Sequence, residues 1–266
     1  MTRSTPIGAR VRRRVGDDLR RTFTSPFEAR GARPLLVHCG HHKAGTVWFR
    51  SVLLTVCRQY GLRHRNGTVR PVPPDADMAY YHSSGMFDVG LIGDRPFRGS
   101  HMVRDPRDLV VSGYEYHLVT EEPWALRPDD HYGGLSYQSR LRGLDEHDGL
   151  MAEVEWVASG TAADMRAWEY DRPEFLELRY EDVIDDEAGA FDRLFRWYGF
   201  SERAVAFGLE SVDRLSLRRG GAQPSHVRSG RPGEWRSRLG PDHIARFKEL
   251  TGDLVVRLGY ESTPDW

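Results

Sequence analysis

A strand, a glycine-bounded turn and a helix follow one another within residues 35–60, and this unit constrains the fold most. The apolar run LLVHC at 35–39 predicts a short buried strand, and the turn GHHKAG at 40–45 follows it directly. Apolar residues then recur at helical spacing over 46–60, until Gly61 ends the pattern. A strand joined to a helix by a tight glycine turn is a unit of parallel sheets, so the sequence predicts an α/β fold.

Strands and helices continue to alternate along the rest of the chain. The further predicted strands lie at 78–82, 100–103 and 174–179. The further predicted helices start near Pro106 and span 150–170, 187–198 and 241–258. We therefore expect a three-layer, P-loop-like α/β architecture: a central, mostly parallel sheet flanked by helices. Folds of this class bind ligands at the carboxyl ends of their strands.

The length of 266 residues suits one large domain or two small ones. Because the strand and helix pattern is continuous from Pro34 onward, we expect a single domain over 34–266. The segment 119–150 is rich in Gly, Pro, Asp and aromatic residues and has no clear period. Long irregular segments of this kind often line binding sites, so it is expected to be a loop or lid.

Composition excludes several classes of protein. Hydrophobic residues make up 39% and charged residues 29%, which excludes a wholly disordered or collagen-like chain. A net charge of −1 gives no overall basic field, so no nucleic-acid partner is expected. Two cysteines, Cys39 and Cys57, cannot build a disulfide framework, which favours a reduced, cytoplasmic setting. No apolar run approaches the roughly 20 residues of a membrane span, and no secretory signal is recognised.

The N-terminal segment 1–33 is strongly basic. It holds nine arginines and three acidic residues, a local net charge of +6. Apolar residues recur every fourth position from Ile7 to Leu19, which is typical of a helix with one apolar stripe. One interpretation is a basic tail helix that packs on the domain or stays solvated. The other is weak peripheral contact with an anionic membrane surface.

The turn at 40–45 has the chemistry of an anion site. A glycine turn that opens a helix directs backbone N–H groups and the positive end of the helix dipole at one spot. Lys43 is one of only two lysines among 38 basic residues, so a compact ammonium is distinctive here. The spacing Gly40-x4-Gly45 is that of a Walker A loop, but Thr46 stands where that motif requires lysine. This disfavours a nucleoside triphosphatase; the plain alternative is a simple connecting turn.

Four segments resemble, in order, the donor-binding motifs of cytosolic-type sulfotransferases. KAGTVW at 43–48 is similar to the 5′-phosphosulfate loop PKSGTTW, and VRDPRDLVVSGY at 103–114 to the 3′-phosphate motif. LELRYEDV at 176–183 resembles the strand-end motif whose tyrosine contacts adenine. RSGRPGEW at 228–235 resembles RKGxxGDW, whose arginine and glycine hold the 3′-phosphate. The chain thus resembles the PAPS-dependent sulfotransferase family over 34–240.

The resemblance implies that 3′-phosphoadenosine-5′-phosphosulfate (PAPS) is the sulfate donor and that no metal takes part. It implies transfer of the sulfuryl group to a hydroxyl of a small molecule, a glycan or a lipid head group, with 119–150 lining the acceptor pocket. Aromatic side chains of that segment are expected to wall the pocket. The donor contacts it implies are made by Lys43, Ala44, Gly45, Thr46, Val47, Trp48, Arg104, Ser112, Tyr180, Arg228, Ser229 and Gly230.

Lys43 and His82 are the expected catalytic residues. Sulfuryl transfer needs a deprotonated acceptor, an in-line donor and stabilised charge on the departing phosphate. Lys43 suits the leaving group because a mobile ammonium can follow the bridging oxygen as it gains charge. In the resembled family the base lies 22 residues before the 3′-phosphate arginine, and counting back from Arg104 leads to His82. A histidine base contributes on the order of 10²–10⁴ in rate.

The chain departs from the family pattern at several positions. His42 replaces the proline before Lys43, Ala44 the serine after it, and Val47 the second threonine of the loop. Tyr80 stands where a basic residue often precedes the base. These changes bear on donor affinity more than on donor identity.

Simpler interpretations exist for several of these residues. Trp48 could be a core residue, His82 a hydrogen-bonded strand-end histidine, and the run RDPRD at 104–108 a surface ion-pair cluster. A zinc site among His38, Cys39, His41 and His42 is disfavoured, because strand geometry separates His38 from Cys39 and no second ligand pair follows.

Two other functions stay open from the sequence. A small-molecule kinase would need a lysine after Gly45 and an acidic magnesium ligand at a strand end, and neither is evident. A catalytically inactive nucleotide-binding or scaffold protein fits the departures in the loop, while retention of Lys43 and His82 argues against it. No nucleophile-elbow or Ser-x-x-Lys segment supports acyl transfer.

Overall fold

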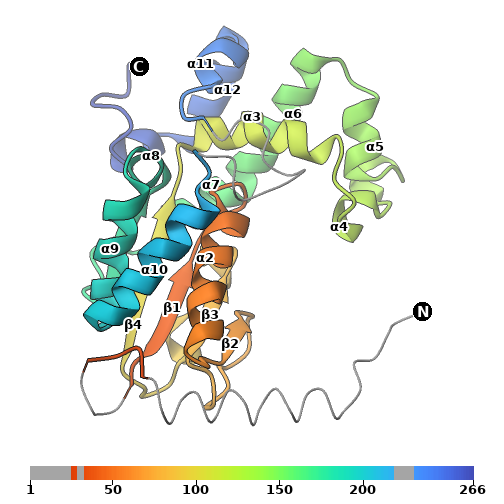
Figure 1. Ribbon diagram of the computed structural model, residues 1–266. Coiled ribbons are helices and arrows are strands. Elements are labelled where there is room, and N and C mark those ends of the chain that lie inside the picture. The colour runs from red at the N-terminus through yellow and green to blue at the C-terminus, as the bar shows by residue number, and fades with distance from the viewer. Residues whose placement is uncertain (1–24, 29–32, 219–230) are drawn as a thin grey trace. The chain divides into compact units, whose positions relative to one another are not determined.

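The computed structural model describes residues 25–28, 33–218 and 231–266 (Figure 1). The apolar stripe predicted within the basic segment 1–33 lies outside the described residues, and so does the membrane contact proposed for it. The predicted donor residues Arg228, Ser229 and Gly230 also lie outside them.

The described residues form two compact units that alternate along the chain. The first unit takes the described parts of 1–40, 45–102 and 169–223. The second takes 41–44, 103–168 and the described part of 224–266. The expectation of one domain over 34–266 stays a prediction.

A five-stranded sheet forms the centre of the first unit. In the order in which they pair, its strands are β2 (His64–Asn66), β3 (Met78–Tyr81), β1 (Leu35–Cys39), β4 (Phe97–Val103) and β5 (Phe175–Arg179). β1 pairs in parallel with β3 and β4, and β2 pairs in parallel with β3. The predicted α/β class, with a central parallel sheet flanked by helices, is confirmed.

The register of the sheet places Gly40, the first residue after β1, beside the end of β3. Cys39 at the end of β1 is the partner of Tyr81 on β3 and of His101 on β4. The N–H of Gly40 donates to the carbonyl oxygen of Tyr81 at 2.9 Å. His82 follows Tyr81 directly, so it lies at the carboxyl edge of the sheet, where parallel α/β sheets bind ligands.

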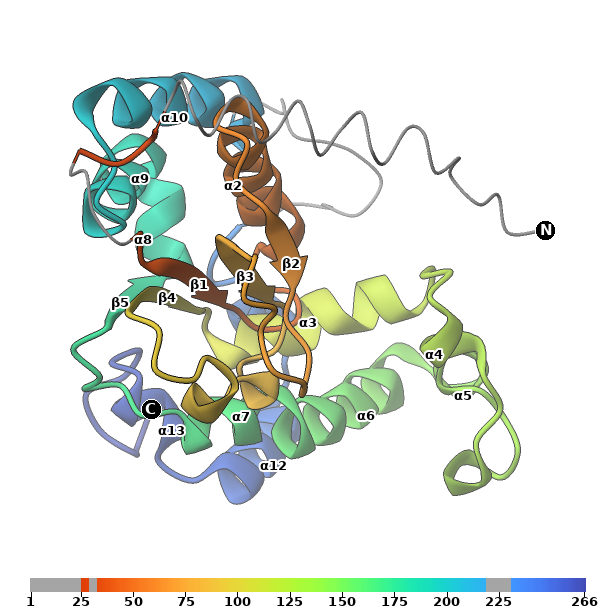
Figure 2. The same cartoon turned by 90° about the horizontal axis from the view of Figure 1, so that it is seen from below.

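Helices α2 (Thr46–Gln59), α8 (Tyr180–Asp185), α9 (Glu187–Trp197) and α10 (Glu202–Leu215) belong to the first unit. Figure 2 shows α2, α9 and α10 on one face of the sheet. Phe49 on α2 and Phe191 on α9 stack with their ring centroids 4.8 Å apart, and both are buried. Gly208 lets α10 approach α9 closely, because a Cβ at this position would lie 2.3 Å from the ring of Phe195.

The second unit is helical in the part that the structure describes. Helix α3 (Pro106–His117) starts with a proline in its first turn, and the side chain of Asp105 caps it by accepting the N–H of Arg107 at 3.0 Å. Helix α3 packs on α6 (Glu146–Ser159), which packs on α12 (Pro241–Thr251). The shorter helices are α4 (Pro123–Leu126), α5 (Tyr137–Arg142), α7 (Thr161–Ala167), α11 (Trp235–Arg238) and α13 (Leu254–Arg257).

Several element bounds differ from the prediction. The helix predicted over 150–170 is two helices, α6 and α7, which Gly160 separates. The helix predicted over 241–258 is also two, because Gly252 adopts φ 60°, a left-handed conformation that ends α12. The segment 119–150 is less irregular than expected, since it contains α4 and α5.

The described helices include none that is long and apolar enough to cross a membrane.

Candidate active site

The turn between β1 and α2 directs positive electrostatic potential at one point. Gly45 is the N-cap of α2 and adopts φ 72°, which a glycine reaches without strain. The first turn of α2 holds no acidic side chain, and the first N–H groups of a helix have no acceptor within that helix. This end of α2 therefore has the features of a phosphate-binding helix N-terminus.

Lys43 is held in an unusual conformation. It is the one residue other than glycine with positive φ, 63°, in the part of the chain that the structure describes. A left-handed residue with a Cβ costs about 1–2 kcal/mol, and such strain is concentrated at functional sites. The Nζ atom of Lys43 lies 3.8 Å from the centroid of the Tyr116 ring, within the range of a cation–π contact. Burial and then the charge of Arg104 lower the pKa of Lys43 to about 8.

Arg104 and Asp108 connect the predicted 3′-phosphate motif to two other segments of the second unit. The side chain of Arg104 is 4% exposed, and its Nη1 donates to the backbone oxygen of Lys43 at 3.0 Å. The carboxylate of Asp108 accepts the N–H groups of Gly233 and Trp235 at 2.6 and 3.0 Å. Burial raises the pKa of Asp108. The unit thus brings parts of three predicted motifs together.

The run RDPRD at 104–108 is not a surface ion-pair cluster, because all five of its residues are buried. The guanidinium of Arg107 is enclosed between the rings of Trp235 and Trp266, with centroid distances of 3.9 and 4.4 Å. It also pairs with Asp105 at 2.7 Å, so this arginine holds the unit together. Of the two arginines in the predicted 3′-phosphate motif, Arg104 is therefore the one that contacts the turn.

Other predicted donor residues lie in the first unit. Tyr180 is buried beside Gly45, where a Cβ would lie 2.9 Å from its Cε2. Thr46 starts α2, and its carbonyl oxygen accepts the hydroxyl of Tyr80 at 2.8 Å. Tyr80, which stands where the family pattern often has a basic residue, therefore fixes the first turn of α2 to β3.

Trp48 and Val47 differ sharply in exposure. Trp48 is 3% exposed and packs its ring edge-to-face on Phe191 with centroids 5.5 Å apart, as a core residue would. Val47 is 61% exposed. Adenine contact by Trp48 stays a prediction, as do the donor contacts of buried Ala44 and of half-buried Ser112 on α3.

Replacing Gly45 with alanine is expected to destabilise the chain more than the loss of glycine alone would. Alanine at φ 72° costs about 1–2 kcal/mol, and the ring of Tyr180 must also move. Gly93 is a matched control because it has φ 66° and would bring its Cβ near no other atom. In urea unfolding, the free energy of unfolding should fall more for Gly45→Ala than for Gly93→Ala. Equal decreases would show that the contact with Tyr180 is not tight.

His38 and Cys39, both on β1, are engaged in ways that do not suit a zinc site. His38 Nδ1 lies 2.8 Å from the hydroxyl of Ser100, and burial raises the pKa of Cys39 well above its ordinary value, which disfavours the thiolate that zinc requires.

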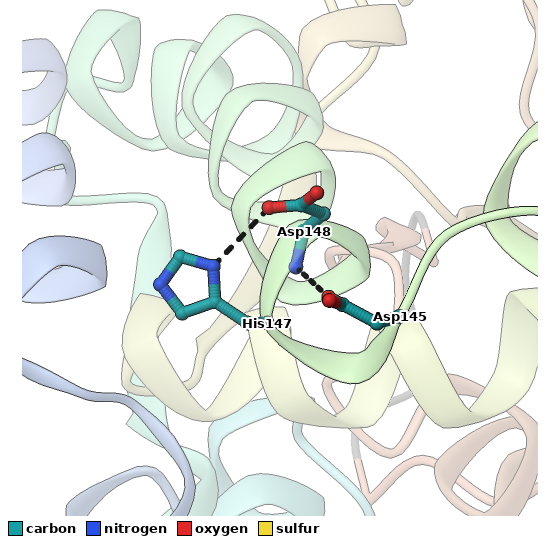
Figure 3. A group of neighbouring side chains, drawn as sticks. All are labelled: Asp145, His147 and Asp148. Atoms are coloured by element: carbon teal, nitrogen blue, oxygen red, sulfur yellow. Dashed lines mark hydrogen bonds and ion pairs between the residues drawn. The ribbon is translucent and has the colours of Figure 1, made fainter.

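Figure 3 shows Asp145, His147 and Asp148, the one group of three potential metal ligands with close ligand atoms in the part of the chain that the structure describes. All three are exposed, and Asp145 caps α6 by accepting the N–H of Asp148 at 2.9 Å. Helix capping accounts for this group.

A cluster of aromatic rings in the second unit, part of which is exposed, was not predicted from the sequence. The rings of Trp124 and Trp156 stack with centroids 5.7 Å apart, and His117 lies against both. Trp124 and Tyr137, from the segment expected to wall the acceptor pocket, take part. Glu153 was the available signal, because it is an acidic residue on the buried face of α6.

No known family and no curated protein matches the sequence. Among solved structures, the mouse sulfotransferase SULT7A1 complexed with PAP is similar with a TM-score of 0.54 and 15% identity, over 86% of this chain and 85% of that one. Retinol dehydratase in complex with androsterone and PAP is similar with a TM-score of 0.49 and 15% identity, over 92% of this chain and 85% of that one. A sulfotransferase from Alicyclobacillus acidocaldarius is similar with a TM-score of 0.42 and 13% identity, over 86% of this chain and 96% of that one. The likeness to the mouse protein shows that this chain has a sulfotransferase fold.

Proposed function

We propose that this chain is a PAPS-dependent sulfotransferase, which moves the sulfuryl group of PAPS to an acceptor hydroxyl by in-line transfer. The observation that carries the proposal is the hydrogen bond from Arg104 to the backbone oxygen of Lys43, which joins two cationic residues of separate motifs. A donor with a 5′-phosphosulfate and a 3′-phosphate needs a point charge and a second, forked cation. The mouse sulfotransferase of the same fold is complexed with PAP, the nucleotide that remains after PAPS gives up its sulfuryl group.

Lys43 stabilises the departing phosphate in this proposal. With a pKa of about 8, its ammonium is charged at neutral pH, and it can donate to the bridging oxygen as charge develops there. The Thr46 hydroxyl and the first-turn N–H groups of α2 bind the 5′ side of the donor. Arg104, with Ser112, Arg228, Ser229 and Gly230, binds the 3′-phosphate.

His82 accepts the proton of the acceptor hydroxyl. It follows β3 at the carboxyl edge of the sheet, and its side chain is exposed. Replacing His82 with alanine is expected to lower kcat about 10²-fold, the contribution of a general base, and to leave PAP binding unchanged. Transfer from radiolabelled PAPS to a panel of phenols, aliphatic alcohols and glycans measures this, with the exposed Arg70→Ala as the control. Full activity of His82→Ala would assign the base elsewhere.

The same assay separates the proposal from its alternatives. PAP binding without transfer to any acceptor would identify an inactive nucleotide-binding protein. Phosphoryl transfer from ATP, with no response to PAPS, would identify a kinase.

A further inference from the structure

Four side chains of the second unit, three of them buried, form a continuous series of hydrogen bonds that begins in the turn. His42 Nε2 lies 3.3 Å from His117 Nε2, and the two rings are nearly coplanar, with an angle of 5° between them. His117 Nδ1 lies 2.6 Å from Glu153 Oε1, and both side chains are fully buried. The hydroxyl of Tyr137 donates to the same oxygen at 2.9 Å. Glu153 and Tyr137 therefore fix one end of the chain, and His42 is the other.

The donor and acceptor capacities of these groups set the direction of the chain. A buried carboxylate only accepts, so His117 donates its Nδ1–H to Glu153. The Nε2 of a neutral His117 is then an acceptor, which makes His42 the donor through its own Nε2–H. The atom of His42 that can gain a proton is consequently Nδ1. A carboxylate that orients a histidine and stabilises its charged form is the arrangement that activates histidine bases.

The protein leaves room for the buried carboxylate. Gly113 on α3 faces Glu153, and a Cβ at this position would lie 2.7 Å from Oε2. Burial, followed by the charge of Glu153, raises the pKa of Tyr137, so its hydroxyl stays a donor to that carboxylate. The hydrogen bonds of Glu153 are concentrated on Oε1, which accepts from both His117 and Tyr137, while Oε2 is buried without a hydrogen-bond partner in the described residues.

Aromatic rings surround the outer end of the chain. The ring of His42 lies 5.5 Å from Tyr116, 5.6 Å from Trp156 and 6.4 Å from Trp124, measured between centroids. Trp124 is 38% exposed, so this group of rings reaches the surface. Lys43 follows His42 in the sequence, and its Nζ lies over the ring of Tyr116. Flat aromatic faces of this kind bind flat acceptors.

We infer that His42, oriented by the positioning residues His117 and Glu153, is a second proton acceptor, which serves aromatic acceptors held against Trp124 and Trp156. The inference rests on the proposed function. The acceptor O–H bond breaks and an N–H bond forms at His42 Nδ1, while the acceptor oxygen bonds to sulfur and the bridging oxygen leaves with the phosphate. The Nε2–H of His42 moves to His117, whose Nδ1–H moves toward Glu153.

Two substitutions at the inner end of the chain should shift the pH profile in opposite directions. Glu153→Gln keeps the size and shape of the side chain but removes the negative charge that stabilises a protonated His42. Tyr137→Phe removes a hydrogen bond that stabilises the carboxylate, which makes Glu153 a better proton acceptor. Tyr116 lies against the ring of His42, Lys43 follows it in the sequence, and Arg104 and Glu122 act electrostatically on Lys43; both substitutions leave these four residues in place.

The test measures kcat/KM against pH, with PAPS as donor and 2-naphthol, a flat aromatic alcohol, as acceptor. Glu153→Gln is expected to move the acidic limb to lower pH by about one unit and to lower the plateau about 10–100-fold. Tyr137→Phe is expected to move that limb to higher pH. Glu155→Gln, on the exposed side of α6 where Glu155 pairs with Arg246, is the matched control and should change neither.

Each outcome decides the inference. A limb that stays fixed in both variants, or no transfer to 2-naphthol by a wild type that sulfates other acceptors, would overturn it and leave the proposed function standing. A wild type that does not bind PAP in calorimetry would instead overturn the proposed function, and the inference with it. If Glu153→Gln does not fold, the shift in Tyr137→Phe decides alone.

Discussion

Replacing Lys43 with alanine is expected to lower the rate of sulfuryl transfer about 10²–10³-fold, the cost of removing one group that stabilises charge in a transition state. The substitution removes the ammonium that meets the bridging oxygen, while the backbone N–H groups of α2 remain. Alanine also keeps the left-handed strain at this position, so the loss of charge is the main change. Single-turnover transfer from PAPS measures the chemical step directly. A variant with wild-type turnover would remove Lys43 from the mechanism.

The pH dependence of Lys43→Arg gives a second test of the same role. Because the pKa of Lys43 is about 8, its ammonium is charged below that pH and is lost as pH rises through it. Wild-type kcat/KM for PAPS, which reports the free enzyme, should therefore fall above pH 8. A guanidinium stays charged throughout this range, so Lys43→Arg should lose the alkaline fall, at a lower plateau because the rigid fork follows the bridging oxygen less well. An alkaline fall that persists in Lys43→Arg would assign it to another group.

Replacing Arg104 with alanine is expected to weaken PAP binding about 10²-fold, equivalent to about 3 kcal/mol. The buried guanidinium supplies the forked hydrogen bonds that suit a phosphate, and nothing in alanine replaces them. Calorimetric titration with PAP and with adenosine 5′-monophosphate measures the two affinities separately.

The monophosphate shows whether the effect is on the 3′-phosphate or on the turn, which Arg104 also supports through the backbone of Lys43. The affinity for the monophosphate should change much less than that for PAP. Arg104→Lys should recover part of the PAP affinity, and the exposed Arg70→Ala should leave it unchanged. Equal losses for the two nucleotides would mean that Arg104 shapes the turn and does not bind the 3′-phosphate.

Local pattern predicts those parts of the fold whose burial is uniform. The run 35–39 is apolar throughout and forms β1 with the predicted bounds, because a central parallel strand is buried on both faces. β2 at His64–Asn66 is short and polar, so it carries no such signal and depends on pairing with β3. Gly160 and Gly252 interrupt helical patterns without changing their period, which is why two helices were predicted where four exist.

The candidate site also has a part that the sequence predicts and a part that it does not. Motif spacing leads to Lys43, Arg104 and Tyr180, because those residues act within short segments of fixed geometry. The chain from His42 to Glu153 joins residues 111 positions apart, and no spacing rule relates them. Tertiary packing of α3 on α6 creates it.

Calorimetric titration of the wild-type protein with PAP, compared with adenosine 5′-monophosphate and ATP, tests the central claim most directly. A PAPS-dependent enzyme should bind PAP at least 10-fold more tightly than either comparison nucleotide, which corresponds to about 1.4 kcal/mol or more from the 3′-phosphate. Equal affinity for PAP and the monophosphate, or a preference for ATP, would contradict the account.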